Sequence, residues 1–205
     1  MAEQQFVFFD LGNVLVNFDH NIAVDALASL TGHQPEFVRH AIFGAGLQVD
    51  YELGRLSDER FARKVAEVLH SALEVEEVLE AYCAIFEPNI PMENVLQWVR
   101  RQAVPAGILS NTCRGHWEWI RRARWPVTDG PFQLEVLSYQ VGAMKPDEAI
   151  YRHAEQQCGR SPPQIFFVDD RPENVYAARR RGWHAVLFEN AERLQRDLES
   201  WLHRR

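Results

Sequence analysis

Five polar residues that could do chemistry stand directly after three short apolar runs. They are Asp10, Ser110, Asn111, Asp169 and Asp170. Carboxylates that gather at one site repel each other, by about 4 kcal/mol for a pair roughly 4 Å apart at an effective dielectric constant of about 20. A cation offsets that repulsion, and a site with few carboxylate ligands suits Mg²⁺. The pattern therefore predicts a magnesium site.

A lysine joins this set further along the chain. Lys145 precedes Pro146, and a proline at the start of a helix would hold the lysine just before the first turn. Each residue alone also has a purely structural explanation. A strand-terminal aspartate often forms a turn, the segment 110–112 could cap a helix, and a single lysine is usually exposed. Together, those explanations would leave several like charges crowded at one site.

The apolar runs predict the strands that would carry these residues. Runs rich in Val, Ile, Leu and Phe span residues 6–9, 106–109, 165–168 and 185–188, with a weaker one at 134–137. Segments with helical spacing lie between and after them, at 117–124, 148–158, 173–181 and 192–203. This alternation is typical of an α/β fold with a doubly wound parallel sheet. Such sheets bind ligands outside the carboxyl ends of their strands.

Residues 18–90 interrupt that alternation. They carry apolar residues at i, i+3 and i+4 steps and no convincing strand, so we expect an all-helical domain inserted after the first strand. Ser57 before Asp58-Glu59 indicates one helix start. A helix at 92–102 would lead back to the sheet. The predicted organisation is a core of residues 1–17 and 91–205 with a helical cap at 18–90.

Composition narrows the range of partners. The 205 residues include 22 Lys and Arg against 29 Asp and Glu, a net charge of −7, which does not favour nucleic-acid binding. The three cysteines are odd in number, far apart and without C-x-x-C spacing, which argues against a disulfide framework and against a zinc site. No apolar run approaches the roughly 20 residues of a membrane span. We expect a soluble, cytoplasmic protein with a small-molecule partner, and the sequence leaves its oligomeric state open.

The order of these motifs resembles that of the haloacid dehalogenase superfamily of phosphatases. The matching residues are Asp10-Leu11-Gly12-Asn13-Val14, then Ser110, Lys145-Pro146 and Asp169-Asp170. Residues 18–90 resemble the helical cap of that family, and the stretch 51–57 (YELGRLS) is similar to one found inside such caps. The D-L-G-N-V sequence resembles a branch that includes sugar-1-phosphatases. The resemblance implies a Rossmann-like core with a cap.

The resemblance also implies a role for each residue. Asp10 would be the nucleophile, forming an aspartyl-phosphate that water later hydrolyses. Mg²⁺ would be held by Asp10, the Gly12 backbone carbonyl and Asp170. Asp169 would bind the ion directly or through water. Ser110 and the Asn111 amide would bind phosphate oxygens, and Lys145 would neutralise charge between nucleophile and phosphate.

One position departs from the family pattern. Most phosphatases of the superfamily carry a second aspartate two residues after the nucleophile, which protonates the leaving group, whereas this chain has Gly12. A general acid contributes about 10²- to 10⁴-fold, so its loss should weaken turnover without abolishing it. Asn13, Asp19 and His20 are nearby residues that could replace it in part.

Three functions are compatible with the sequence. The first is a magnesium-dependent phosphatase of a small phosphorylated metabolite, such as a sugar phosphate. The second is a 2-haloacid dehalogenase, whose departing halide needs no proton, with Arg39 or Arg55 holding the halide or carboxylate. The third is a domain that binds a phosphorylated metabolite or a protein without turnover. In an enzyme, cap residues between 43 and 51, Gln48 and Asp50 among them, would select the substrate.

Overall fold

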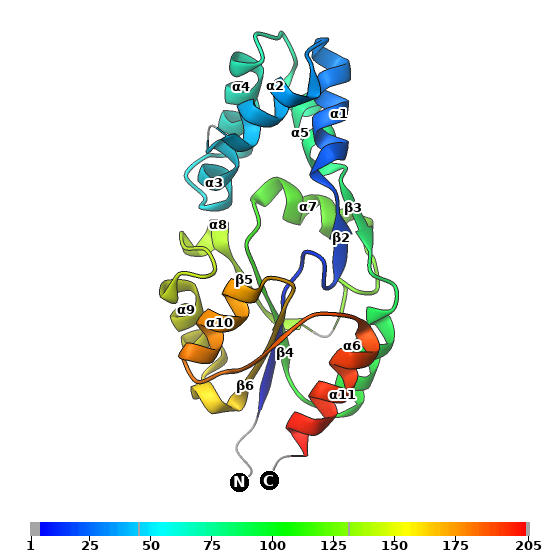
Figure 1. Cartoon of the computed structure of the whole chain (residues 1–205), viewed down its shortest axis with the longest axis vertical. Coiled ribbons are helices and arrows are strands. Elements are labelled where there is room, and N and C mark those ends of the chain that lie inside the picture. The colour runs from blue at the N-terminus through cyan, green and yellow to red at the C-terminus, as the bar shows by residue number, and fades with distance from the viewer. Residues whose placement is uncertain (1–4, 45, 131, 204–205) are drawn as a thin grey trace.

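The computed structural model describes residues 5–44, 46–130 and 132–203 of the chain. A sheet flanked by helices forms the lower part of Figure 1, and a group of helices forms the upper part. The carboxyl ends of the strands point toward the upper part. Within the described ranges, none of the helices has the length and apolar content that crossing a membrane requires.

The sheet has five parallel strands in the order β5-β4-β1-β6-β7. Their bounds are Phe6–Phe9 (β1), Ala106–Ser110 (β4), Phe132–Leu137 (β5), Ile165–Asp169 (β6) and His184–Leu187 (β7). Strand order reverses at β1, because β4 and β5 lie on one side of it and β6 and β7 on the other. The predicted doubly wound sheet is confirmed, and each predicted strand overlaps an observed one.

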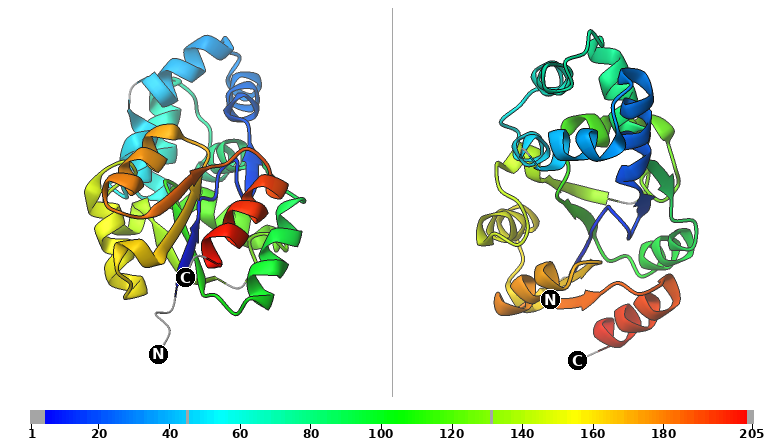
Figure 2. Two further views of the ribbon diagram at one scale, coloured as in Figure 1. Left: turned by 60° about the horizontal axis from the view of Figure 1, so that its bottom comes forward. Right: turned by 45° about the horizontal axis from the view of Figure 1, so that its top comes forward.

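Helices cover both faces of the sheet, and the side chains of β1 point alternately to one face and to the other. Val7 and Phe9 belong to one buried cluster with α6, α7 and α11, whereas Phe6 and Phe8 pack with α9 and α10. The bounds are Met92–Arg101 (α6), Arg114–Ala123 (α7), Glu148–Cys158 (α9), Pro172–Arg180 (α10) and Ala191–Leu202 (α11), with a 3₁₀ turn at Pro162–Gln164. Figure 2 shows the two helical layers. A strand buried on both faces is apolar throughout, as in FVFF.

The predicted helices of the core agree with the observed ones within one residue, except at the start of α7. That helix begins at Arg114 rather than at residue 117. Its first turn carries Arg114, Gly115 and His116. None of these residues is apolar, so this turn lacks the helical spacing of apolar residues on which the prediction depended.

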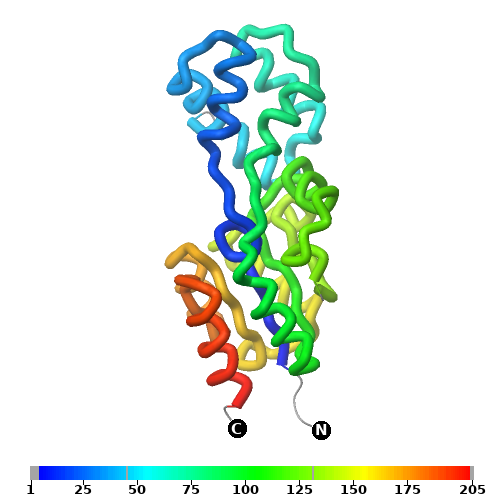
Figure 3. Tube along the Cα trace, turned by 90° about the vertical axis from the view of Figure 1, so that its right-hand side faces the viewer, coloured from blue at the N-terminus to red at the C-terminus, as the bar shows by residue number. Residues whose placement is uncertain are grey.

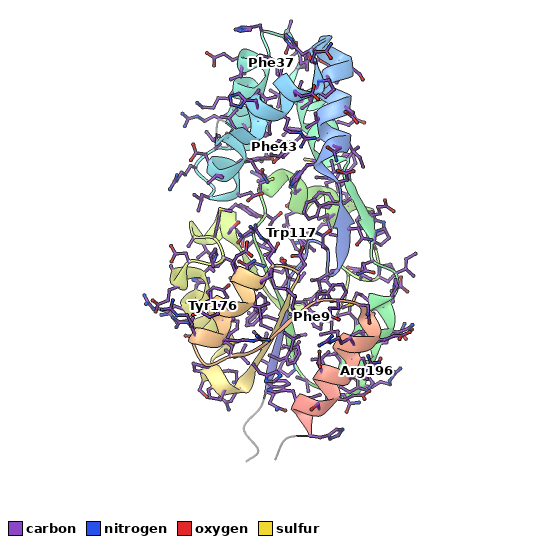
Figure 4. The ribbon with its side chains drawn as sticks, in the orientation of Figure 1. Phe9, Phe37, Phe43, Trp117, Tyr176 and Arg196 are labelled. Carbon is purple, nitrogen blue, oxygen red and sulfur yellow. The ribbon has the colours of Figure 1, made fainter. Side chains whose placement is uncertain are left out.

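The cap consists of short helices around a buried cluster of its own. They are α1 (His20–Thr31), α2 (Pro35–Arg39), the π-helical turn η1 (His40–Gly44), α3 (Leu47–Glu52), α4 (Asp58–Val68) and α5 (Val75–Cys83). Ser57 caps α4, as predicted, by accepting a hydrogen bond from the Arg60 backbone N–H. Figure 4 shows Phe37 and Phe43 in the cap, above Trp117 of α7 and Phe9 of the core.

The connection between core and cap differs from the prediction. β2 (Val16–Phe18) and β3 (Phe86–Pro88) pair in an antiparallel sheet, so the expectation of no strand in residues 18–90 is wrong. Three-residue strands are too short to show an alternating pattern. Figure 3 shows the two connections side by side between core and cap. The domain boundaries at 17/18 and 90/91 stay a prediction.

Candidate active site

Asp10 follows β1 directly, in the middle of the sheet. Its backbone N–H donates to the Val168 carbonyl of β6 at 2.9 Å, which fixes this residue against the neighbouring strand. The side chain is buried, and Oδ1 accepts a hydrogen bond from the Leu11 backbone N–H at 2.7 Å. A carboxyl group is thus held where the strand order reverses, the place where such sheets bind ligands.

Lys145 connects the ends of three strands. Its Nζ lies 2.7 Å from Asp10 Oδ1, 2.6 Å from Asp169 Oδ2 and 2.8 Å from the Leu109 carbonyl oxygen. An ammonium group has three protons, so each contact uses one of them. Burial opposes the charge of Lys145, but the two carboxylates outweigh it and raise the pKa of the lysine above its usual value. The side chain therefore stays charged.

Asn111 anchors the loop that carries Lys145. The Asn111 side chain donates from Nδ2 to the Lys145 carbonyl at 2.8 Å and accepts at Oδ1 from the Lys145 N–H at 2.7 Å. Because the side chain holds this loop, the group through which Asn111 can reach a phosphate oxygen is its backbone N–H.

Pro146 does not begin a helix, contrary to the prediction. The Lys145–Pro146 peptide bond is cis, and α9 begins at Glu148. Asp147 is the N-cap, since its side chain accepts a hydrogen bond from the Ala149 backbone N–H. Aspartate is a strongly preferred N-cap residue, so α9 begins at Glu148, as the helical spacing of residues 148–158 predicts, and Pro146 lies outside the helix.

The paired aspartates after β6 have different surroundings. Asp169 is fully buried, and besides its contact with the lysine it accepts hydrogen bonds from Asn174 Nδ2 (2.9 and 3.1 Å) and the Arg171 backbone N–H (2.9 Å). Asp170 is less buried, and its Oδ2 accepts from Asn13 Nδ2 at 2.9 Å. Asp170 therefore has more capacity for an external ligand than Asp169, which is bound largely to the protein.

The three carboxyl groups form a cluster that fits a divalent cation. Oxygen atoms of Asp10, Asp169 and Asp170 lie within 4.8 Å of one another, and the single ammonium of Lys145 leaves negative charge in excess. Burial raises the pKa of Asp10 to about 7, with Lys145 opposing the shift and Asp169 adding to it. A divalent cation would offset the repulsion and favour the ionised form of Asp10. Mg²⁺, which prefers oxygen ligands, matches this donor set.

A cavity of about 160 Å³ lies over these residues and is shared by core and cap. The core contributes Asp10, Gly12, Ser110, Asn111, Lys145 and Asp170, and the cap contributes His20, Gln48 and Glu52. Of the residues predicted to be catalytic, phosphate-binding or metal-binding, Asp169 is the one that does not line the cavity. It contacts the Lys145 ammonium below the cavity surface. Asp50 instead pairs with Arg55 at the surface, so of the two cap residues named for substrate selection only Gln48 lines the cavity.

Gly12 lies against an aromatic ring. A Cβ atom at this position would be 2.7 Å from Phe18 Cε1, a distance that real Cβ atoms do not tolerate. The Phe18 ring therefore occupies the space into which a side chain at position 12 would extend.

The three nearby residues considered as replacements for the missing acid are poorly suited to it. Asn13 is an amide bonded to Asp170. Asp19 caps α1 by accepting from the Asn21 backbone N–H at 2.8 Å. His20 lines the cavity, but burial lowers its pKa, which disfavours the protonated form that an acid needs.

Glu52 is a cavity residue that sequence analysis did not select. It ends α3 and is 8% exposed, and its Oε1 accepts a hydrogen bond from Gln48 Nε2 at 2.7 Å. Burial raises the pKa of the Glu52 carboxyl group, although the Gln48 hydrogen bond and the charge of Arg171 oppose the shift. The stretch YELGRLS pointed to this segment, but a six-residue helix contains too few apolar residues to show which side is buried.

The core holds the cap closely beside Glu52. Ser138, the first residue of α8 (Ser138–Val141), has its hydroxyl oxygen 2.7 Å from the Glu52 carbonyl oxygen and accepts from the Thr112 N–H at 2.9 Å. A Cβ atom at Gly54 would lie 2.1 Å from the Tyr139 carbonyl oxygen. Only glycine permits this approach of the two backbones, so α3 is fixed against the core.

Residues 5–182 match the family model described as haloacid dehalogenase-like hydrolase. The chain belongs to this hydrolase family. It is 25% identical over 198 residues to the D-ribitol-5-phosphate phosphatase of Bacteroides thetaiotaomicron, covering 94% of this chain and 95% of that protein. It is 26% identical over 177 residues to the sesquiterpene phosphatase astK of Aspergillus oryzae, covering 85% and 84%.

The family fold is also found by structural comparison. A haloacid dehalogenase-family enzyme of Bacteroides thetaiotaomicron, in complex with magnesium and inorganic phosphate, superimposes with a TM-score of 0.82 at 21% identity. The match covers 91% of this chain and 95% of that one. The predicted fold, family and enzyme class are confirmed.

Proposed function

We propose that this hydrolase is a magnesium-dependent phosphatase that acts on a small phosphorylated metabolite, such as a sugar phosphate, through an aspartyl-phosphate on Asp10. The observation that carries the proposal is the bridge that Lys145 makes between Asp10 and Asp169, beside the Asp170 carboxyl group. A carboxylate that attacks a phosphate dianion meets like-charge repulsion, and a buried ammonium against the nucleophile reduces it.

The reaction takes place in two displacements at phosphorus. Asp10 attacks the phosphorus atom in line, and the bond from phosphorus to the leaving oxygen breaks. The Ser110 hydroxyl and the Asn111 backbone N–H bind phosphate oxygens, and Lys145 offsets their charge. Water then attacks phosphorus, which releases inorganic phosphate and restores the Asp10 carboxylate.

The residues that would hold Mg²⁺ are Asp10, Asp170 and the Gly12 backbone carbonyl, with Asp169 bound directly or through water. When bound, the ion supplies positive charge that stabilises the phosphoryl oxygens as negative charge develops on them. Two named relatives support the substrate class, because one acts on D-ribitol 5-phosphate and the other is a sesquiterpene phosphatase.

Two alternatives have less support. A 2-haloacid dehalogenase would use an arginine at the site, but Arg55 pairs with Asp50 with 65% of its side chain exposed, and Arg39 donates to Asn21. Neither of these two arginines is among the residues that line the cavity. Arg171 does line it, but its guanidinium pairs with Glu173. A domain that binds without turnover has Gly12 as its main support.

The test measures phosphate release from a panel of sugar phosphates with Mg²⁺ and with EDTA, and chloride release from 2-chloropropionate. We expect phosphate release that requires Mg²⁺ and no chloride release. In Asp170→Asn, the Mg²⁺ concentration for half-maximal activity should rise, whereas the exposed control Asp50→Asn should behave as the wild type. Chloride release would favour the dehalogenase, and absence of both products would favour binding without turnover.

A further inference from the structure

The reaction proposed above needs a proton donor that the chain around Asp10 does not supply. The alkoxide that leaves a sugar phosphate is strongly basic, so its departure is slow unless an acid protonates the oxygen. Position 12 is a glycine, and the Phe18 ring occupies the space beside it. The donor therefore has to come from another element of the fold.

Glu52 is a carboxyl group in the cavity that neither nucleophilic attack nor metal binding uses. Among the described residues that line the cavity, the other carboxyl groups belong to Asp10 and Asp170. Asp10 reaches the cavity from the sheet, and Glu52 reaches it from α3 of the cap. In-line attack places the leaving oxygen opposite the nucleophile, which is the side from which Glu52 enters.

The surroundings of Glu52 favour the protonated form that an acid needs. The carboxyl group is buried, and burial disfavours its charged state, so the pKa lies above the ordinary value. Its hydrogen-bonding neighbour is the uncharged amide of Gln48, which donates to Oε1. This arrangement leaves Oε2 available to carry the proton.

The backbone of Glu52 is also fixed in place. Its carbonyl oxygen lies 2.7 Å from the Ser138 hydroxyl, and Ser138 accepts in turn from the N–H of Thr112. Thr112 follows Ser110 and Asn111, the proposed phosphate-binding residues. The position of the acid is therefore set relative to the phosphate site by two hydrogen bonds.

We propose that Glu52 is the general acid and base of this enzyme, an inference that rests on the proposed phosphatase function and deepens it. As Asp10 bonds to phosphorus, the bond from phosphorus to the leaving oxygen breaks, and the Glu52 proton moves to that oxygen. The products are an alcohol, the aspartyl-phosphate and the Glu52 carboxylate. Glu52 then takes a proton from the attacking water, the bond from phosphorus to Asp10 breaks, and both carboxyl groups return to their starting states.

The experiment compares wild type and Glu52→Gln on two esters with different leaving groups. With ribitol 5-phosphate, whose alkoxide needs a proton, we expect kcat/KM to fall about 10²- to 10⁴-fold. With p-nitrophenyl phosphate, whose leaving group needs none, kcat/KM should change less than about threefold. Because water activation is also impaired, the variant should show a burst of p-nitrophenol, and its intact mass should show phosphorylated protein.

Glu59→Gln is the matched control, since Glu59 is an exposed cap glutamate paired with Arg63. It should leave both kcat/KM values unchanged, and Glu52→Asp should recover part of the loss on ribitol 5-phosphate. An equal fall on both esters would indicate a structural role and overturn the proposal, as would no fall on either. If the wild type released phosphate from neither ester, the phosphatase function itself would be overturned. If the wild type were active and Glu52→Gln equally active, only the role of Glu52 would be overturned.

Discussion

The Phe18 ring and the Gly12 backbone lie so close that a Cβ atom at position 12 would be 2.7 Å from Phe18 Cε1. Phe18 belongs to β2, the strand through which the chain leaves the core for the cap. Position 12, where most phosphatases of the superfamily carry an acid, is therefore in contact with Phe18. A larger residue at position 12 requires that the Phe18 ring move or be replaced.

Gly12→Asp alone should not restore a second acid. The new side chain would overlap the Phe18 ring, and overpacking typically costs about 1–3 kcal/mol, so we expect a lower free energy of unfolding and no gain in activity. Gly12→Asp with Phe18→Ala should hydrolyse alkyl phosphates faster than Phe18→Ala alone. Urea denaturation and kcat/KM on ribitol 5-phosphate check the two expectations. A single variant as stable as wild type would contradict the described packing.

Asp10→Asn should remove nearly all turnover while the protein stays folded. An amide is a far poorer nucleophile than a carboxylate, so we expect kcat on p-nitrophenyl phosphate to fall by roughly 10³-fold or more. Circular dichroism should match the wild type. Asp50→Asn is the control, because Asp50 pairs with Arg55 at the surface. Retention of more than about a tenth of the activity would contradict the nucleophilic role.

Lys145→Met should destabilise the fold as well as stop catalysis. The variant removes the cationic partner of two buried carboxyl groups and a donor to the Leu109 carbonyl, and removal of one member of a buried pair typically costs about 3–5 kcal/mol. Arg55→Ala, which breaks an exposed pair, should cost less than about 1 kcal/mol. Urea denaturation compares the two. If they cost the same, the bridge contributes no more than a surface ion pair.

Glu52 should make the stability of the protein fall as pH rises. Its pKa is higher in the folded protein than its ordinary value of about 4.5, so at intermediate pH the unfolded chain binds fewer protons than the folded one. The wild type therefore loses free energy of unfolding as pH rises through the interval between the two values, and glutamine has no such titration. Relative to wild type, Glu52→Gln should gain stability from about pH 4.5 upward and then level off.

Urea denaturation of both proteins at a series of pH values, in metal-free buffer, measures that difference. A difference that changes in the opposite direction with pH would mean that Glu52 is ionised in the folded protein.

Much of the fold followed from apolar patterning. β1 and β6 are apolar because both of their faces are buried, so FVFF and IFFV could be recognised as strands from sequence alone. β2 and β3 could not, since each has three residues, too few to show an alternating pattern, and the two pair with each other. Their pairing depends on the cap folding between them, a contact across almost the whole length of the insertion.

The site was predictable in so far as its residues follow strands. Asp10, Ser110 and Asp170 could be selected as candidates because parallel strands end at one edge of a sheet, and all three line the cavity. Glu52 could not be found in this way, because it reaches the cavity from a short helix whose position depends on Ser138 and on the close approach at Gly54. The side-chain role of Asn111, which holds Lys145, is likewise a property of two loops that meet only in the folded protein.

The two connecting strands lie together on one side of the molecule, and α3 meets α8 on the other side. The cap is thus joined covalently along one edge, and the Ser138 hydroxyl contributes a contact at the opposite edge. Together with the close approach at Gly54, this contact holds the cavity-lining residues Gln48 and Glu52 over the strand ends. The cap is therefore tied to the core at two opposite edges, although only one of them is a covalent connection.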